Sequence, residues 1–364
     1  MTDRARRLRG LRRVVPEGRL GRAAAEARAS RPVEVRGARP RRRGAQPKVV
    51  ALGGGMGLSA SLAALRRITG DLTAVVTVAD DGGSSGRLRD ELGVLPPGDL
   101  RKALAALCGD DEWGQTWARV IQHRFQSQGD LHDHAVGNVL IVALWEQLGD
   151  HVMALDLVGR LLGAHGRVLP MSAVPLELQA LVKGHDPARP EDVDTVRGQA
   201  TVALTPGEVQ SVHLVPSDPP AVPEAVEAVL DADWVVLGPG SWFSSVIPHL
   251  LVPELLDALT QTKARRVLPL NLAPQPGETE GFSPQRHLEV LGRHAPKLAL
   301  DVVLADEAAV PDRDSLTEAA KRLGAAVELA PVARTDGTPR HDPELLAAAY
   351  DRIFRMHGRI GPWR

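Results

Sequence analysis

A glycine-rich turn between an apolar run and a helical pattern constrains the fold of this chain more than any other feature. Lys48–Leu52 (KVVAL) predicts a buried strand, and Leu58–Arg67 predicts a helix. The residues from Gly55 to Ala60 match the pattern G-x-G-x-x-A, in the strand–turn–helix order of nucleotide-binding βαβ units. This order favours parallel strands joined by right-handed crossovers, and hence an α/β fold.

The rest of the chain repeats this alternation and predicts a Rossmann-like, doubly wound α/β domain with a mostly parallel sheet. Further strands of that sheet are expected at Leu72–Val78, Trp234–Leu237, Arg266–Leu270 and Val302–Ala305. A helical insertion is expected from four consecutive helices at Asp99–Leu107, Trp113–Phe125, Ala135–Leu148 and Val152–Leu162. A β-rich insertion is expected from strands at Leu176–Val182, Gln199–Leu204 and Val209–Leu214. The other expected helices are Pro223–Leu230, Pro253–Thr260, Leu316–Leu323 and Pro343–Met356.

Two parts of the chain differ in charge. Residues 1–47 hold 15 arginines, no lysine and four acidic residues, although the whole chain has a net charge of -1. Because this segment has few large apolar residues, its burial cannot offset its ordering entropy, and we expect a disordered Arg-rich extension. The α/β domain is expected over residues 48–364. No aromatic residue lies among the arginines, so nucleic acid is not an expected partner.

Other protein classes are excluded by what the sequence lacks. No apolar run approaches the roughly 18 residues that a bilayer helix needs, and we expect no membrane span. The N-terminal segment has no apolar core of the kind that a secretory signal needs. Cys108 is the only cysteine, so no intrachain disulfide can form. A cytoplasmic protein is therefore expected.

A second glycine-rich loop follows the next predicted strand. Asp80 and Asp81 stand at its carboxyl end, where open α/β sheets bind ligands. An acidic residue here could bind a ribose hydroxyl, or the pair could hold Mg²⁺ through its oxygens. Further ligand donors are expected from Gly82, Gly83, Ser84, Ser85 and Arg87. The alternative is a flexible turn with solvated acidic side chains.

Two polar clusters lie in the predicted helical insertion. Gly98 and Asp99 predict a turn in which Asp99 caps the helix N-terminus. Arg101 would then lie in the first turn, where a cation is unfavourable without a nearby anion, so it contacts a ligand or is simply exposed. His134 and Asn138 would lie one turn apart, either in a polar pocket or in a structural role, and no metal is expected there.

A third glycine-containing loop ends another predicted strand. Gly238, Gly240 and Ser241 can offer backbone and hydroxyl donors to an anion. Ser241 lacks the G-x-S-x-G pattern of a hydrolase nucleophile. Asn271 follows the next strand, and the segment Gln275–Gly281 is expected near the same sheet edge.

Seven segments form a recognisable set: GGGMGLS, VTVADDGGSSGRLRDELGVLPPGDLRKAL, QHRF, HAVGNVLI, GRVLP, GPGSWFSSVIPHLLVP and NLAPQPGETEGF. Together they resemble the gluconeogenesis factor (YvcK-type) family, relatives of the CofD-like 2-phospho-L-lactate transferases, over about Lys48 to Asp342. The resemblance implies a cytoplasmic bacterial protein that binds UDP-N-acetylglucosamine. It also implies support of cell shape and wall synthesis on gluconeogenic carbon, with no established reaction.

The resemblance also implies ligand-binding residues. The three glycine loops match the pocket motifs of the family, and Arg340-His341 resembles a family pair in which Arg340 contacts phosphate. Phe243 and Phe282 stand where the family usually has tyrosine, which removes two hydroxyls, and Ala319 stands where relatives have an aromatic residue. The complete predicted set for nucleotide and phosphate is Gly53, Gly54, Gly55, Gly57, Leu58, Ser59, Asp80, Asp81, Gly82, Gly83, Ser84, Ser85, Arg87, Gly98, Asp99, Arg101, His134, Asn138, Gly238, Gly240, Ser241, Asn271 and Arg340.

Three functions compete. The preferred one is a UDP-sugar-binding regulator with no catalytic residue and no required cofactor, which acts through unidentified cell-envelope proteins and forms a homo-oligomer. The alternative is a phosphotransferase with Mg²⁺ on Asp80 and Asp81. A nicotinamide dehydrogenase is disfavoured, because the second glycine loop lies where the ribose of adenosine would bind.

Overall fold

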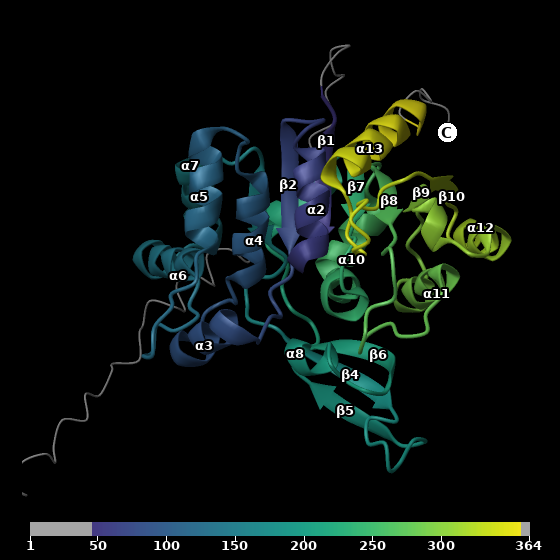
Figure 1. Cartoon of the computed structure of the whole chain (residues 1–364), viewed down its shortest axis with the longest axis horizontal. Helices are drawn as coiled ribbons and strands as arrows, with labels where there is room; N and C mark the ends of the chain where they lie inside the picture. The colour runs from purple at the N-terminus through teal and green to yellow at the C-terminus, as the bar shows by residue number, and fades with distance from the viewer. Residues whose placement is uncertain (1–45, 358–364) are drawn as a thin grey trace, which may run out of the picture. The chain divides into compact units, whose positions relative to one another are not determined.

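A seven-stranded, entirely parallel sheet forms the centre of the chain in the computed structural model, which describes residues 46–357 (Figure 1). Its strand order is β10-β9-β8-β7-β1-β2-β3. The strands are β1 (Lys48–Gly53), β2 (Asp71–Val76), β3 (Arg167–Pro170), β7 (Trp234–Leu237), β8 (Arg265–Pro269), β9 (Val302–Ala305) and β10 (Ala326–Leu329). The order runs outward in both directions from the β1–β7 pair, which confirms the predicted doubly wound sheet.

The central strands are continuous apolar runs because helices cover both faces of the sheet. All four residues of β7 and of β9 are buried, as are five of the six in β1. The helices outside the two insertions are α2 (Gly55–Leu65), α9 (Pro223–Asp231), α10 (Pro253–Gln261), α11 (Pro284–His294), α12 (Arg313–Arg322) and α13 (Pro343–His357). Because the strand order reverses at β1, right-handed crossovers place α2 and α10 on opposite faces.

The predicted helical insertion is confirmed between β2 and β3. It comprises α3 (Gly83–Leu92), α4 (Gly98–Leu107), α5 (Glu112–Gln122), α6 (Val136–Leu148) and α7 (His151–Leu162). Asp111 and Asp150 cap α5 and α7 by accepting backbone N–H groups. Helix α3 was predicted as a loop; its glycine- and serine-rich start concealed the amphipathic turn that buries Leu88.

The β-rich insertion is a three-stranded antiparallel sheet of order β5-β4-β6. Its elements are β4 (Glu177–Lys183), β5 (Val193–Arg197), the short helix α8 (Gln199–Val202) and β6 (Glu208–Val215). The predicted strand at Gln199–Leu204 is wrong, since α8 begins there. Gly198 adopts a φ of 87°, and the Asp81 carboxylate accepts the Ala200 N–H at 2.9 Å, which together start a helical turn.

Four further elements were not predicted. They are β3, β5, β10 and α11. The two outer strands of the large sheet, β3 and β10, have four residues each, and β5 buries only Val196. Short or polar segments of this kind lack the apolar runs that reveal a buried strand.

No helix within residues 46–357 is long and apolar enough to cross a bilayer. The expected disorder of residues 1–47 lies outside the described residues, apart from Gln46 and Pro47. Gln46 accepts the Gly70 N–H at 2.7 Å, and the Pro47 carbonyl accepts the Thr69 hydroxyl at 2.6 Å. The described chain therefore joins the domain just before β1.

Candidate functional site

Two glycine loops meet where the strand order reverses. The first loop leaves β1 and opens α2, and the second leaves β7 through the cis peptide bond Gly238–Pro239. A Cβ at Gly57 would lie 2.3 Å from the Pro239 carbonyl oxygen, so only glycine allows this approach of the two backbones. In open α/β sheets ligands bind at this point, outside the carboxyl ends of the strands.

A cavity of about 580 Å³ lies over these loops. Its lining comprises Gly54–Gly57, Ser59, Ala60, Ala63, Pro239–Ser241, Ser245, Asn271–Pro276, Arg334, Pro339–His341 and Pro343. The volume is in the range of small-molecule sites. Of the predicted residues, the structure brings Gly54, Gly55, Gly57, Ser59, Gly240, Ser241, Asn271 and Arg340 to this cavity. Gly53, Leu58 and Gly238 do not line it, and the Leu58 side chain is buried in the core.

The start of α2 is suited to an anion. Gly54 occupies the N-cap without any side-chain cap, and no acidic residue lies in the first turn. The backbone N–H groups of that turn are therefore not taken by a capping side chain and add to the positive end of the helix dipole. Ser59 donates its hydroxyl to the Gly55 carbonyl at 2.9 Å and fixes the turn.

Two arginines face the cavity from one turn of chain. Arg334 donates its backbone N–H to the Arg340 carbonyl at 2.9 Å, and Ala333 pairs with His341 beside them. Both arginine side chains line the cavity, together with His341. Arg334 was not predicted, because nothing in the local sequence shows that the chain folds back to pair it with Arg340.

His341 differs from its arginine neighbours because it is held neutral. Only 8% of the residue is exposed, and burial lowers its pKa to about 4 although it donates to the Leu270 carbonyl. The positive charge of this turn therefore comes from Arg334 and Arg340.

Side chains after β8 hold the glycine loop after β7, Gly238–Ser241, in place. Asn271 accepts the Gly240 N–H at 3.0 Å and donates to the Gly240 carbonyl at 2.8 Å, and Gln275 donates to the Ser241 hydroxyl at 3.2 Å. Glu278 is buried and accepts the Ser244 hydroxyl at 2.5 Å, and burial raises its pKa. The expectation that Gln275–Gly281 lies at this edge is thus confirmed, and Asn271 positions the loop.

The predicted loop after β2, Asp80–Arg87, belongs to a different cluster, which meets the loop after β1 behind Gly54. A Cβ at Gly98 would lie 2.8 Å from an Asp80 carboxylate oxygen, and one at Gly54 would lie 2.6 Å from Asp99. Burial, and then the charge of Asp99, raises the pKa of Asp80. Asp99 does not cap α4 as predicted; it lies inside the first turn and forms an ion pair with Lys102 at 2.9 Å.

Asp80 and Asp81 are held by different elements. The Asp80 carboxylate accepts the Gly82 N–H at 3.0 Å beside α4, whereas Asp81 reaches Ala200 at the start of α8. Among residues 46–357 no group of three or more histidine, cysteine or acidic side chains could hold a metal ion. The Mg²⁺ site on Asp80 and Asp81, considered for the phosphotransferase, stays a prediction.

Ser84 joins two helices of the insertion, α3 and α6. Its hydroxyl lies 3.0 Å from His134 Nδ1, accepts the Asn138 side-chain N–H at 3.0 Å and accepts the Ala135 N–H at 3.3 Å. Arg87 donates to the backbone carbonyls of the loop before α6, at Asp130 and His132. The structure thus brings His134 and Asn138 together, but it uses them to join α3 to α6.

Arg101 lies inside the protein, and the alternative of an exposed arginine is wrong. Only 4% of the residue is exposed, and its Nε has no partner among the described residues. Burial lowers its pKa, followed by the effect of Arg124. It does not line the cavity over the loops after β1 and β7.

Comparisons with known proteins agree on one family. Residues 49–337 match the family model described as 2-phospho-L-lactate transferase CofD. The chain is 55% identical over 308 residues to a "putative gluconeogenesis factor" of Mycobacterium tuberculosis, a match that covers 84% of this chain and 90% of the relative. It is 39% identical over 269 residues to the gluconeogenesis factor of Listeria monocytogenes, covering 73% and 80%. The crystal structure of a UPF0052 family member from Bacillus halodurans superimposes with a TM-score of 0.75 at 32% identity, covering 84% and 99%.

Proposed function

The chain belongs to the CofD family, and from this premise we propose that its cavity binds a nucleotide sugar, UDP-N-acetylglucosamine. The protein is then a cytoplasmic gluconeogenesis factor that reports the level of this sugar nucleotide to cell-envelope proteins. Through them it supports cell shape and wall synthesis on gluconeogenic carbon. One observation carries the binding proposal: two glycine loops and two arginines surround one cavity at the point where the strand order reverses.

The charges and surfaces of the cavity support a diphosphate ligand. The diphosphate lies against the backbone N–H groups at the start of α2, and Arg334 and Arg340 balance its charge. Leu272 and Pro274 provide an apolar wall for the base or the sugar. The described lining contains no carboxylate that would repel the phosphates.

The same lining supports binding without a reaction. Its only titratable groups besides the two arginines would be the hydroxyls and His341, and burial holds His341 neutral with a pKa of about 4. A general base or acid near neutral pH is thus not among the described lining residues. The proposal is therefore of a binding protein, and it invokes no cofactor.

A transferase remains the second candidate because Asp99 lies directly behind Gly54, next to Asp80. An acidic cluster beside a phosphate loop is suited to a second substrate that carries hydroxyl donors. This candidate requires consumption of a nucleotide-activated donor by folded protein. If no donor is consumed, with or without Mg²⁺, this candidate is excluded.

The proposal is tested by titrating UDP-N-acetylglucosamine into the full chain by calorimetry and by thermal shift. A ligand at about 100 times its Kd adds about 2.7 kcal/mol and raises Tm by several degrees. Arg334→Ala and Arg340→Ala should each weaken binding at least tenfold, since each removes a charge-assisted contact worth about 1.5–3 kcal/mol. Arg355→Ala, which removes an exposed arginine of α13, is the matched control.

GDP, NAD and a deazaflavin serve as competing ligands in the same series. A shift confined to UDP-sugars supports the proposal. A shift only with GDP and the deazaflavin moves the assignment to the transferase. Unchanged binding in both arginine variants would place the ligand elsewhere.

A further inference from the structure

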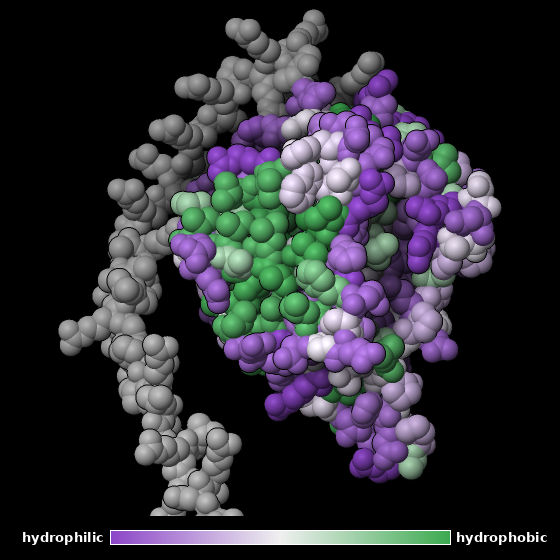
Figure 2. Space-filling view, turned by 60° about the vertical axis from the view of Figure 1, so that its left-hand side comes forward, coloured by the Kyte–Doolittle hydropathy of each residue, from purple (hydrophilic) through white to green (hydrophobic). Residues whose placement is uncertain are grey.

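Three consecutive helices of the helical insertion present an apolar surface to solvent. Helices α5, α6 and α7 pack on one another, and Figure 2 shows that apolar residues gather on this side of the domain with polar residues around them. We call this surface the α5–α7 face. Its large side chains, each more than a third exposed, are Trp113, Val120, Val139, Leu148, Met153, Leu157 and Leu161.

The face is continuous from one helix to the next. Met153, Leu157 and Leu161 follow one another at four-residue spacing and form one stripe along α7. At the end of this stripe, Trp113 Nε1 of α5 donates to the Leu161 carbonyl at 3.2 Å, and its ring lies 5.7 Å from that of Trp117. The other side of α7 is already buried in the domain, so this helix is apolar on two sides. In a surface helix, the side opposite the buried one normally carries polar residues and faces solvent.

The exposed apolar area of the face is near the upper end of the range found on monomers. With roughly 150–250 Å² for a large side chain, the seven exposed fractions amount to about 550 Å² of apolar surface. The largest apolar patch on a typical monomer is about 300–600 Å², and a stable interface buries about 800 Å² on each partner. The apolar face alone supplies most of that area, and its charged rim supplies the rest.

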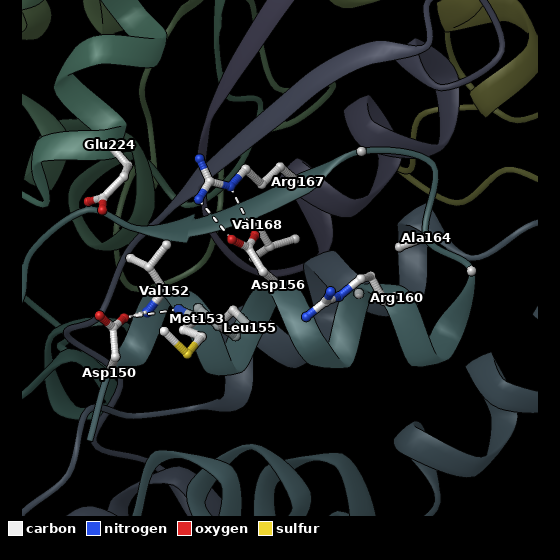
Figure 3. Close-up of a pocket in the computed structure, with 13 residues that line it drawn as sticks. Asp150, Val152, Met153, Leu155, Asp156, Arg160, Ala164, Arg167, Val168 and Glu224 are labelled. Carbon is white, nitrogen blue, oxygen red and sulfur yellow. Dashed lines mark hydrogen bonds and ion pairs between the residues drawn. The ribbon is translucent and has the colours of Figure 1, made fainter. Parts of the chain in front are cut away.

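We propose that the α5–α7 face binds the same face of a second copy of this chain and forms a two-fold symmetric dimer. A two-fold interface uses one patch twice, so the patch must be complementary to itself. The charges along α7 meet this condition. A groove of about 640 Å³ follows α7 and β3, with Arg160 towards one end and Asp150 and Glu224 towards the other (Figure 3).

An antiparallel crossing of two α7 helices brings the basic end of each groove to the acidic end of the other. Arg160 has no ion pair within the described residues and is exposed at the edge of the face. Between the two ends, Asp156 and Arg167 already satisfy each other through bonds of 2.9 and 2.8 Å. The apolar stripe then supplies the affinity, and the charges at both ends fix the direction of the helices.

The rim charges favour a second copy over a membrane surface. Near the ends of the three helices the acidic residues outnumber the arginines: Asp110, Asp111, Glu112, Glu146 and Asp150 against Arg119, Arg124 and Arg160. A surface that inserts into an anionic membrane carries lysine and arginine around its apolar side. Trp113 and Trp117 on α5 are, in contrast, of the residue type that typically anchors protein interfaces.

The test is light scattering and sedimentation equilibrium on the full chain over a range of micromolar concentrations. We expect a particle of twice the 38.9 kDa chain mass that dissociates on dilution. Met153→Glu with Leu157→Asp should raise the dimer Kd by roughly 100-fold or more, because unpaired charges would be buried. Leu204→Glu is the matched control, since Leu204 is 83% exposed and lies at the end of α8, outside the face.

A charge exchange tests the direction of the helices. Arg160→Glu and Glu224→Arg should each weaken the dimer, and the two together should restore it. Circular dichroism and thermal unfolding of each variant show whether the fold is kept. If the double variant fails to restore the dimer, the antiparallel arrangement is wrong.

Three results would overturn the proposal. These are a monomeric wild-type chain throughout the concentration range, a dimer that survives the Met153 and Leu157 changes, and a monomer that sediments with anionic vesicles through this face. The last result would assign the face to a membrane surface. A dimer lost only in the face variants, with Leu204→Glu unchanged, supports it.

Discussion

The Gly54–Gly57 loop and the Asp80–Arg87 loop are similar in sequence, since each follows a parallel strand and opens a helix, but the structure uses them differently. Both α2 and α3 begin at a glycine without a capping side chain, but of the two loops only the first lines the cavity. The second is tied to its neighbours by its own side chains, through Asp81 to α8 and through Ser84 to α6. Two glycine-rich strand ends of similar sequence therefore differ in the segments that they contact. Those contacts are set by the tertiary structure and not by the glycine pattern.

The largest effect should come from adding one methyl group where the first loop touches the loop after β7. In Gly57→Ala the new Cβ would meet backbone at 2.3 Å, so the loops must separate. We expect a loss of about 3 kcal/mol in the free energy of unfolding and a loss of UDP-sugar binding. Urea unfolding and calorimetry measure both.

Gly82→Ala is the matched change in the second loop. Its Cβ would have no neighbour closer than 3.5 Å, and Gly82 has an ordinary φ of -94°. We expect little change in stability or binding. Equal losses in the two variants would remove the distinction between the loops.

The next effect concerns Ser84, which joins α3 to α6. Ser84→Ala leaves the buried N–H groups of Ala135 and Asn138 without their acceptor and the ring of His134 without its partner. This should lower the free energy of unfolding by about 2 kcal/mol. UDP-sugar affinity should not change if the second loop is structural. A drop in affinity at unchanged stability would return Ser84 to the ligand site.

The free energy of unfolding should depend on pH through His341, which lines the cavity. Burial depresses the pKa of His341 to about 4, below the value near 6.5 of an unfolded histidine. The stability that neutral His341 contributes is therefore present above pH 6.5 and is lost as the pH falls towards 4, at up to about 1.4 kcal/mol per pH unit. Urea unfolding of the wild type and of His341→Asn at pH 7, 6 and 5 should show a shallower decline in the variant. Parallel curves for the two proteins would contradict this.

The smallest expected effect is a gain in the free energy of unfolding. The pKa of Asp80 is raised by burial and by Asp99, so its charged form is disfavoured in the folded state. Wild-type stability from this group is full at low pH and is lost as the pH rises through the raised pKa. Asp80→Asn should therefore stabilise the protein by about 1 kcal/mol at pH 7 and by nothing at a pH below the pKa of both states.

Asp81→Asn is the control for this change. Asp81 accepts the Ala200 N–H with a charged oxygen, so the substitution weakens that contact and should not stabilise the protein. Differential scanning calorimetry compares the two variants. Stabilisation by both would mean that general acidic repulsion, and not the setting of Asp80, is responsible.

Sequence patterns predicted the middle of the large sheet well and its outer strands poorly. β7 and β9 were predicted with the bounds that they have, because a strand buried on both faces is a short, continuous apolar run. β10 lies at one outer position and buries none of its four residues, and β3 lies at the other with a buried run of only three, Val168–Pro170. A local pattern records burial, so the less of a strand is buried, the weaker its pattern is.

The candidate site also has parts that sequence patterns predicted and parts that they did not. Glycine and serine patterns identified the loops after β1 and β7, since both features lie within a few consecutive residues. They did not identify Arg334, which reaches the cavity only because the chain folds back to Arg340. They also did not show that Asp80 accepts the Gly82 N–H beside α4 while Asp81 accepts the Ala200 N–H at the start of α8.

The sequence by itself determined the α/β class, the doubly wound order of elements and the family, because apolar period, turn chemistry and motif spacing are all local properties. Only the tertiary structure decided which glycine loops line the cavity, which arginines line it with them, and that α5–α7 leave an apolar surface uncovered. Those outcomes depend on partners far apart in the chain, such as Gly57 with Pro239 and Asp81 with Ala200. Packing and hydrogen bonding between distant segments select them, and no local pattern encodes those contacts.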